Sequence, residues 1–523
     1  MKKYIFLVLT GLTFGIVQSQ EVKDALRYSQ DNLNGTARFK AMGGAFGALG
    51  GDLSSLNVNP AGSAIFINNQ VAVTLNNTDI KNNSNYFGTT TTDTNNSFDL
   101  NQAGGVFVFK NQNMKSNWKK IAVGINYENT NDFNNSVFSA GTNPTNSIAN
   151  YFLSYANKGN NGAPVPQTFV NTQAGESISQ LYGYLGSNLP SADYPKLKGF
   201  DAQQAMLGYQ GYLINPTDDT NANSTFASNV AAGGKYYQEN SVFSSGYNGK
   251  LSFNAATSYK DRLYLGMNLN SHFTDFRQSS LFYEDNNNPL DANYRVIKAQ
   301  FNNELYTYGT GFSFQLGAIA KVTSAMRLGL AYESSTWYHL NDEFSQKLIA
   351  VSSNIDGPLP SDVVDPKTTN IYAPYNLQTP SKVTGSFAYV FGKSGLISID
   401  YAVKDYSKTK FKPENDPYFN TVNNTINATL DNSAELRIGA EYKIDKLSLR
   451  GGYRYEQSPY KNGTTIGDLT GYSGGLGYNF GSTKADLAYS YAKRDSQQGF
   501  FSQGLTDGAK INSLNTNITF TLL

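Results

Sequence analysis

Residues 434–456 read AELRIGAEYKIDKLSLRGGYRYE, and two kinds of side chain alternate along them. Leu436 and Ile438 fall on one face of an extended chain, and Glu435 and Arg437 fall on the other, because successive side chains of a strand point to opposite sides. The alternation is interrupted for two residues and then resumes. The stretch therefore predicts two antiparallel strands joined by a tight turn, with all charges on one face.

The same alternation recurs along the chain and predicts fourteen strands. They lie near 70–79, 98–110, 118–130, 247–259, 262–276, 304–320, 325–337, 382–391, 395–405, 433–443, 446–456, 468–480, 483–493 and 511–522. Six of the connections are tight turns and alternate with seven long loops. A water-soluble sandwich would also alternate apolar and polar positions. An even strand count with alternating short and long connections favours a transmembrane barrel of the bacterial outer membrane.

We therefore expect an all-β fold, a 14-stranded antiparallel transmembrane β-barrel over residues 69–523, with both termini in the periplasm. Its long extracellular loops include an insertion at about 140–245. Apolar residues recur at helical spacing in three parts of this insertion, which predicts short helices at Ser147–Asn157, Ile178–Leu185 and Ala202–Tyr212. The Asn- and Thr-rich stretch Asn76–Asn96 is expected to be a solvated loop.

Residues 1–20 combine Lys2 and Lys3 with an apolar stretch and a small-residue site, the pattern of a cleaved signal peptide. The chain has no cysteine, which excludes a lipid-modified cysteine, disulfides and thiolate metal sites. The formal net charge is +1, so nucleic acid is not an expected partner. Mean hydropathy is −0.42, a value compatible with barrel strands because half of their side chains can be polar.

Only two histidines, His272 and His339, could serve as a catalytic base or a haem ligand. The period of the strands places His272 on the lumen face, and His339 falls near the start of an external loop. Each is more simply a polar residue of the wall or the loop than part of a catalytic site. We expect no enzyme activity, no metal and no cofactor.

The segment before the first strand contains an unusual run of small residues. Residues 41–52 read AMGGAFGALGGD, with Met42, Phe46 and Leu49 between the glycines and alanines. A phosphate-binding loop would need a following Gly-Lys-Ser/Thr, which is missing, and a flexible linker would be more polar. Small residues allow close approach of two backbones. We therefore predict that residues 21–68 form a hatch that fills the barrel.

This hatch sequence resembles the FadL/TodX family of outer-membrane hydrophobic-compound transporters, in the form found in Bacteroidetes. The resemblance covers Arg38–Phe66 and includes the run GGAFGA at 43–48 and Asn59-Pro60-Ala61-Gly62 just before the first strand. Members of the family have fourteen strands and an N-terminal hatch with an Asn-Pro-Ala motif.

The resemblance implies a channel for hydrophobic small molecules such as long-chain fatty acids or aromatic hydrocarbons. The ligand would be held beside the hatch and released sideways through the wall. Hatch or gating residues would be Asn59, Pro60, Ala61, Gly62, Met42, Phe46 and Leu49. Arg437, Arg450 and Arg454 face the lumen by alternation and are candidate ligand contacts, although lumen charges more often form structural ion pairs.

The other expected partners are outer-membrane lipid and lipopolysaccharide, and the barrel is expected to be a monomer. The alternative function is a non-transporting barrel that acts as a scaffold or shuttle in an envelope or secretion machine, because fold alone does not separate these roles. A transporter should have an apolar, ligand-sized pocket at the hatch. A scaffold should instead have an exposed apolar patch on its loops.

Overall fold

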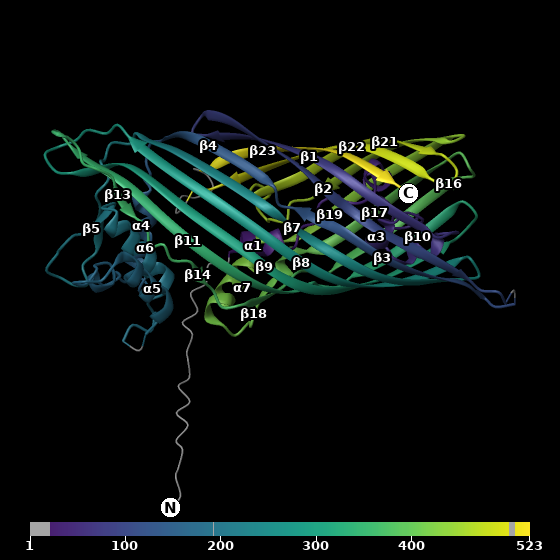
Figure 1. Ribbon diagram of the computed structural model, residues 1–523, viewed down its shortest axis with the longest axis horizontal. Coiled ribbons are helices and arrows are strands. Elements are labelled where there is room, and N and C mark those ends of the chain that lie inside the picture. Colours follow the sequence, from purple (N-terminus) through teal and green to yellow (C-terminus); the bar gives the residue numbers. More distant parts are fainter. Residues whose placement is uncertain (1–20, 114, 192, 501–507) are drawn as a thin grey trace, which may run out of the picture.

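The computed structural model describes residues 21–113, 115–191, 193–500 and 508–523. They form a closed antiparallel barrel of fourteen wall strands, drawn side by side in Figure 1. The wall strands are β1 Gln70–Tyr86, β2 Thr89–Lys110, β3 Trp118–Asp132, β7 Tyr236–Tyr259, β8 Leu263–Asn286, β9 Arg295–Lys321, β10 Met326–Glu333, β16 Lys382–Phe391, β17 Gly395–Asp405, β19 Asn432–Ile444, β20 Leu447–Glu456, β21 Ile466–Asn479, β22 Lys484–Gln498 and β23 Ala509–Leu522. The last strand pairs with both β22 and β1, which closes the barrel.

All fourteen predicted strands are present, and most extend further than predicted at one end. The six tight turns also lie where they were predicted, and they share one end of the barrel, called here the short-turn end. The opposite end is called the long-loop end. Outward-facing residues such as Val71, Phe107, Leu330 and Phe520 are exposed around the wall, as lipid-facing side chains should be. Within the described residues, no helix has the length and apolar character needed to cross a membrane.

The expectation of a solvated loop at Asn76–Asn96 is wrong. Strands β1 and β2 continue as a paired hairpin up to Tyr86 and Thr89. Phe87 and Gly88 form the turn, with φ of 43° and 85°, values typical of the tight turns that join hairpin strands. Asn and Thr occupy both faces of this hairpin, so the sequence has no apolar-polar alternation to indicate a strand.

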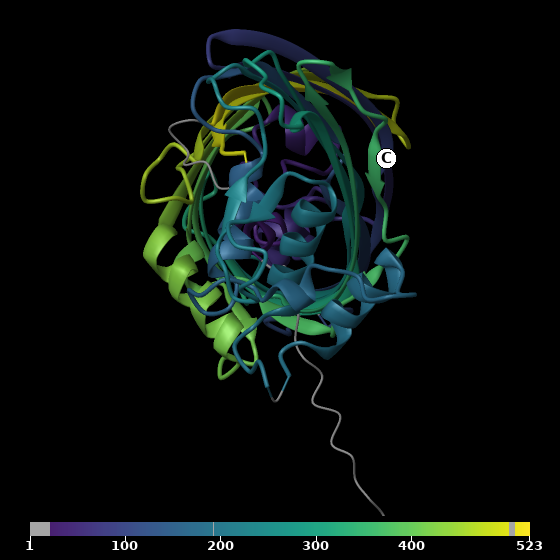
Figure 2. The same ribbon diagram turned by 90° about the vertical axis from the view of Figure 1, so that its left-hand side faces the viewer.

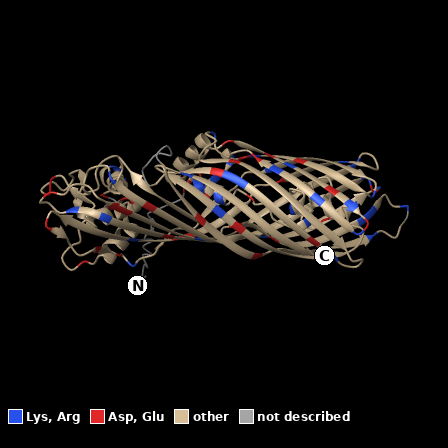
Figure 3. Ribbon diagram, turned by 90° about the horizontal axis from the view of Figure 1, so that it is seen from above, with Lys and Arg blue, Asp and Glu red and all other residues tan. Residues whose placement is uncertain are grey.

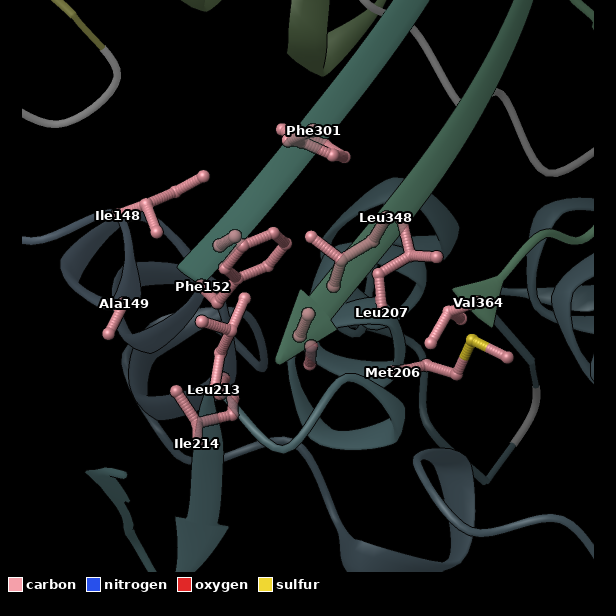
Figure 4. Packing of buried hydrophobic residues seen from close by; sticks show 14 of the residues in the cluster. Ile148, Ala149, Phe152, Met206, Leu207, Leu213, Ile214, Phe301, Leu348 and Val364 are labelled. Carbon is pink, nitrogen blue, oxygen red and sulfur yellow. The ribbon is translucent and has the colours of Figure 1, made fainter. Parts of the chain in front are cut away.

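At the long-loop end, β7, β8, β9 and β11 Trp337–Asn354 continue past the other strands and support a helical cap. The three predicted helices are confirmed as α4 Ala149–Lys158, α5 Ile178–Asn188 and α6 Gly199–Gln210. They pack on the strand extensions through a shared apolar core that includes Phe152, Leu207, Phe301 and Leu348 (Figure 4). This burial holds the cap on the barrel.

The remaining elements are short and lie in the connections of the long-loop end. They are η2 Gln167–Phe169, β4 Asn135–Asn143, β5 Ile214–Pro216, β6 Phe226–Ser228, β12 Gly357–Pro358, β13 Asp362–Val364, β14 Asn370–Ile371, β15 Tyr375–Gln378, η3 Tyr406–Lys408, β18 Lys410–Lys412 and α7 Pro417–Thr429. Helix α7 was not predicted, although Asp416 caps it and Pro417 occupies its first turn.

The N-terminal segment runs through the lumen along the barrel axis. Helix α1 Val22–Arg27 packs against α7 and the aromatic residues Phe133 and Phe276 at the long-loop end. The chain then descends to η1 Pro60–Ile65 near the short-turn end before β1 begins. Leu523 also lies at the short-turn end, where it pairs with Lys484. Within the described residues, α1 and Leu523 therefore lie at opposite ends of the barrel, and the periplasmic position expected of both termini stays a prediction.

Candidate functional site

The hatch consists of α2 Ala37–Ala41, α3 Ser55–Val58 and η1 with the turns between them. Figure 2 looks into the barrel and shows this N-terminal segment inside the ring of strands. Nearly every residue from 36 to 66 is buried. Met42, Phe46 and Leu49 pack with Phe39 in an apolar cluster at the centre of the hatch. Residues 1–20, which include the predicted signal peptide, lie outside the described residues.

Inward-facing glycines of the wall allow the hatch backbone to touch the barrel backbone. At each of six positions a Cβ atom would come within 3.0 Å of a hatch atom. These six residues, called here the glycine belt, are Gly266, Gly317, Gly329, Gly439, Gly452 and Gly475. The hatch atoms that they meet belong to residues 41–43, 47–48 and 59–61. The small residues of the hatch therefore face small residues of the wall. An added side chain on either side would push the hatch away from the wall.

Asn59 joins the hatch to the wall through its side chain. Its amide nitrogen donates to the carbonyl of Gly47 at 2.7 Å and to that of Ala318 in β9 at 3.0 Å. Its amide oxygen accepts from the backbone of Ala61 at 3.1 Å, which caps η1 with Pro60 at the first position. Gly62 accepts from the backbone of Gly51. The Asn-Pro-Ala-Gly motif thus forms one tight, buried turn.

A second anchor, Asp400 of β17, was missed from the sequence. Its carboxylate oxygen Oδ2 accepts hydrogen bonds from the backbone nitrogens of Phe46 and Gly47, each at 2.9 Å. The residue is buried. Period-two alternation places Asp400 on the lumen face, but nothing local in the sequence indicates a partner more than 350 residues away.

A cluster of ion pairs joins the N-terminal segment to three neighbouring wall strands, β10, β16 and β17, beside the hatch on its long-loop side. Asp31 lies 3.6 Å from the ammonium nitrogens of both Lys382 and Lys404, and Lys382 also pairs with Glu333. Burial alone would raise the pKa of Asp31, but the nearby Lys404 and Lys382 lower it below its usual value. Together with residues of the hatch, these charged side chains line a small space inside the lumen.

The three predicted lumen arginines all face inward and all have carboxylate partners. Arg437 pairs with Glu435 at 2.5 Å, Arg450 with Asp486 at 2.6 Å, and Arg454 with Glu435 at 3.1 Å. Arg437 and Arg454 share the carboxylate of Glu435, whereas Arg450 lies in a different part of the lumen.

A cavity of about 410 Å³ lies beside the hatch, toward the long-loop end. We call it the hatch cavity. Arg454 lines it, whereas Arg437 lines the charged cluster and Arg450 lines a different cavity, of about 440 Å³, at the short-turn end. Leu33, Phe133 and Phe276 give the hatch cavity an apolar side. Its other side is polar, with amides and hydroxyls from β1, β22 and β23. The lining is therefore mixed, not uniformly apolar as expected of a transporter.

The hatch cavity reaches a seam in the barrel wall. Strands β2 and β3 form ladder pairs only as far as Gln102 and Glu128. Beyond that point no ladder pair joins residues 89–101 to 129–143, although all of these residues are described. Side chains bridge the gap, with Ser97 donating to Asp132 and Asn129 donating to Asp99, each at 2.7 Å. We call this region the β2–β3 seam. It lies next to the cavity because Asp132 and Asn135 also line the cavity.

The two histidines lie apart. His272 faces the lumen, with Nε2 2.8 Å from the hydroxyl of the fully buried Ser313 and Nδ1 3.5 Å from the hydroxyl of Tyr338. No carboxylate orients the ring in these contacts. His339 lies on β11 and contacts Asn376. The described residues contain no cluster of three or more His, Cys, Asp or Glu that could hold a metal ion.

A closed barrel with a built-in hatch and a cavity beside it is the architecture of a plugged membrane channel. The family described as outer membrane protein transport protein (OMPP1/FadL/TodX) matches residues 191–517, more than half of the chain. The chain belongs to this family of outer-membrane transport proteins, as its hatch sequence suggested.

One solved structure with a TM-score above 0.5 supports the same fold. The structure of a Pseudomonas aeruginosa FadL homologue is 13% identical, with a TM-score of 0.52, and the match covers 94% of this chain and 98% of the other. The Pseudomonas putida toluene transporter TodX is 12% identical, with a TM-score of 0.46 and coverage of 94% and 98%. At such identities the likeness concerns the fold alone. No curated protein sequence matches the chain.

Proposed function

We propose that the protein takes up hydrophobic small molecules across the outer membrane, such as long-chain fatty acids or aromatic hydrocarbons. The ligand enters at the long-loop end, rests in the hatch cavity, and leaves sideways through the β2–β3 seam. The observation that carries this proposal is the position of the cavity, which lies beside the hatch and ends at the seam. The exposed apolar residues Phe98 and Leu100 lie on the outer face beside the seam, where a hydrophobic ligand would meet lipid.

The mixed lining of the hatch cavity suits an amphiphile better than a plain hydrocarbon. Phe133 and Phe276 offer apolar contact for a tail, and Arg454 lies where it could reach an anionic head group. We assign Asn59, Pro60, Ala61, Gly62, Met42, Phe46 and Leu49 to holding the hatch in place. Arg437 and Arg450 line other spaces and are assigned to ion pairs that support the lumen.

The proposed division of the chain is a signal peptide at 1–20, a hatch at 21–68 and the barrel at 69–523. The short-turn end faces the periplasm, so that Leu523 is periplasmic and α1 lies at the cell-surface mouth. The barrel acts as a monomer that contacts outer-membrane lipid and lipopolysaccharide, and neither catalysis nor a cofactor is part of the proposal.

A disulfide across the seam tests this route, since the chain has no cysteine of its own. Cysteines at Ser97 and Asp132, whose side chains touch at 2.7 Å, would join β2 to β3. Uptake of a labelled fatty acid should fall under oxidation and return with a reductant. The matched control places the two cysteines at Thr74 and Thr521, whose hydroxyls lie 2.8 Å apart. These residues belong to β1 and β23, which are already paired in the ladder. Uptake that is unaffected by the oxidised seam pair would refute sideways release.

A scaffold role is the second candidate, and one observation favours it. Large apolar residues are exposed in the loop after β11, namely Ile355, Leu359, Val363 and Ile371. Such a patch is typical of a partner-binding surface. A deletion strain separates the two functions: equal uptake of several hydrophobic substrates with and without the protein would leave only the scaffold role.

A further inference from the structure

The short-turn end carries a strong excess of positive charge. The tight turns and their flanking residues, 110–120, 259–262, 321–327, 391–395, 443–447 and 479–484, contain twelve Lys or Arg and two Asp. The whole chain has a formal net charge of only +1. Figure 3 shows blue segments gathered at the end of the barrel where the C-terminus lies. We call this set of residues the basic rim.

The charges of the basic rim are largely free of carboxylate partners. Lys110, Lys260, Lys393, Lys446 and Lys484 are exposed, and none has an ion-pair partner within 4.0 Å among the described residues. At the other end of the barrel some lysines do have carboxylate partners, as Lys298 does in Asp285 and Lys347 in Asp365. These five lysines therefore keep their charges available for an external anion.

The rim lies at the edge of the lipid-facing surface. Next to its lysines, large apolar side chains point outward and are at least 47% exposed, including Phe109, Trp118, Phe391, Tyr442 and Phe480. Aromatic residues at this level mark the boundary between hydrocarbon and head groups. A lysine one or two residues further on can extend its ammonium group to the phosphates of that leaflet.

We propose that the basic rim binds anionic phospholipid head groups of the leaflet at the short-turn end. The charges occur at all six turns, so they surround the barrel as an annulus of lipid does. A protein partner would dock on one side and would need a charge patch on that side only. Attraction of anionic lipid by clustered lysines is a general property of charged surfaces near membranes. The proposal does not depend on the transported ligand.

The two tryptophans provide a reporter and an internal control. Trp118 lies within the rim, and Trp337 lies at the start of β11, away from the short-turn end. Both side chains are exposed, by 47% and 43%. The full chain with Trp337→Phe is reconstituted in phosphatidylcholine vesicles that contain either brominated phosphatidylglycerol or brominated phosphatidylcholine. Trp118 fluorescence then reports which lipid is in contact with the rim.

We expect brominated phosphatidylglycerol to quench Trp118 about twofold more than brominated phosphatidylcholine at the same fraction. The excess should disappear in high salt and in a variant with Lys→Gln at Lys110, Lys260, Lys393, Lys446 and Lys484. The matched control carries five Lys→Gln substitutions at the other end of the barrel and should preserve the excess quenching. Its substituted residues are the exposed Lys158, Lys196, Lys198, Lys235 and Lys367.

Three results would overturn the proposal. One is equal quenching of Trp118 by the two lipids, and another is an excess that survives the rim substitutions. The third is an equal excess at Trp337 in a Trp118→Phe protein. Binding of soluble polyglutamate to the rim without lipid preference at Trp118 would instead assign the surface to an acidic protein. Heat-modifiable mobility of each variant checks that the barrel is folded.

Discussion

The carboxylate of Asp400 lies 2.9 Å from the backbone nitrogen of Gly47, so that a wall strand holds the hatch by its main chain. A second bond to Phe46 completes the contact. Because the interaction uses backbone donors, it constrains the position of the hatch whatever side chains the hatch carries. It also gives the hatch an anchor on the side of the lumen opposite the seam.

Replacing Asp400 with Ala should loosen the hatch without unfolding the barrel. Two buried hydrogen bonds to a charged group are lost, at about 1.5–3 kcal/mol each. Hydrogen exchange of the amides of residues 44–50 should become faster, while the wall strands stay protected. Asp405→Ala is the control, since Asp405 caps η3 outside the hatch. If hydrogen exchange in the Asp400→Ala variant were unchanged, the contacts at the glycine belt would be enough to hold the hatch in place.

Adjacent glycines of β20 allow a sharp test of the glycine belt. A Cβ at Gly452 would collide with Met42 and Gly43, whereas a Cβ at Gly451 would lie 4.0 Å from the carbonyl oxygen of Ser473. Gly452→Ala should therefore lower the temperature at which the heat-modifiable form is lost, with overpacking costing about 1–3 kcal/mol. Gly451→Ala should leave it unchanged. If the two substitutions changed this temperature equally, the hatch would have to lie further from β20 than it does in the structure.

The lumen arginines should differ in their effect on ligand selection. Arg454 lines the hatch cavity, and Arg450 lies in the short-turn cavity beyond the hatch. Arg454→Gln should weaken uptake of fatty acids, which carry a carboxylate, more than uptake of toluene. Arg450→Gln should affect both equally, through the loss of its ion pairs with Glu441 and Asp486. Identical selectivity in the two variants would remove Arg454 from the ligand site.

Lys40 of the hatch should make stability depend on pH. Burial lowers its pKa to about 7, with Arg454 also lowering it and Asp99 opposing the shift. Its ammonium nitrogen donates to Asn76 at 2.9 Å. Because the folded pKa is below the unfolded value of 10.5, the unfolded chain binds more protons between those values, and stability rises with pH across that window. The cost of burying the charge is fully present below pH 7.

Lys40→Met removes this cost and should stabilise the protein near pH 6, where the difference is largest. Asn76 keeps a donor in Thr519 at 2.8 Å, so the substitution leaves no unpaired acceptor there. The advantage should shrink as the pH approaches 10. The measurement is the temperature at which each protein loses the heat-modifiable form, taken near pH 6 and near pH 10. If Lys40→Met raised this temperature equally at both pH values, the assigned pKa of Lys40 would be wrong.

Tags should distinguish the two ends of the barrel on intact cells. An epitope at Asn287, between β8 and β9, should be labelled at the surface. One inserted at Gly392–Ser394, between β16 and β17, should be labelled only after the membrane is opened. Labelling of the short turn on intact cells would reverse the proposed orientation.

The wall of the barrel could be predicted because lipid and lumen impose opposite demands on alternate residues. The bounds of β16 and β17 agree with the sequence, as the contrast is strong there. The upper part of the β1–β2 hairpin was missed because both of its faces are polar. Alternation also placed Arg450 and Arg454 in the lumen, but they are four residues apart, about 13 Å along a strand. The sequence alone could not tell which side of the hatch each one occupies.

The glycine belt and Asp400 depended on contacts that local patterns do not record. Inward glycines at positions such as Gly439 and Gly452 look like ordinary members of a polar face. Their role becomes visible only once the hatch backbone lies against them. The composition of the hatch predicted close packing correctly, but not the strands that receive it.

The glycine belt has a consequence for how such proteins can be recombined. Six strands leave out a side chain where the hatch touches them, and at four of these places the nearest hatch atom belongs to its backbone. A hatch transplanted from a distant relative would contact the wall at other positions. It would meet side chains there, while the six glycines would face no part of it. Exchange of hatches between barrels should therefore fail unless the matching wall positions are exchanged with them, and the two parts must have diversified together.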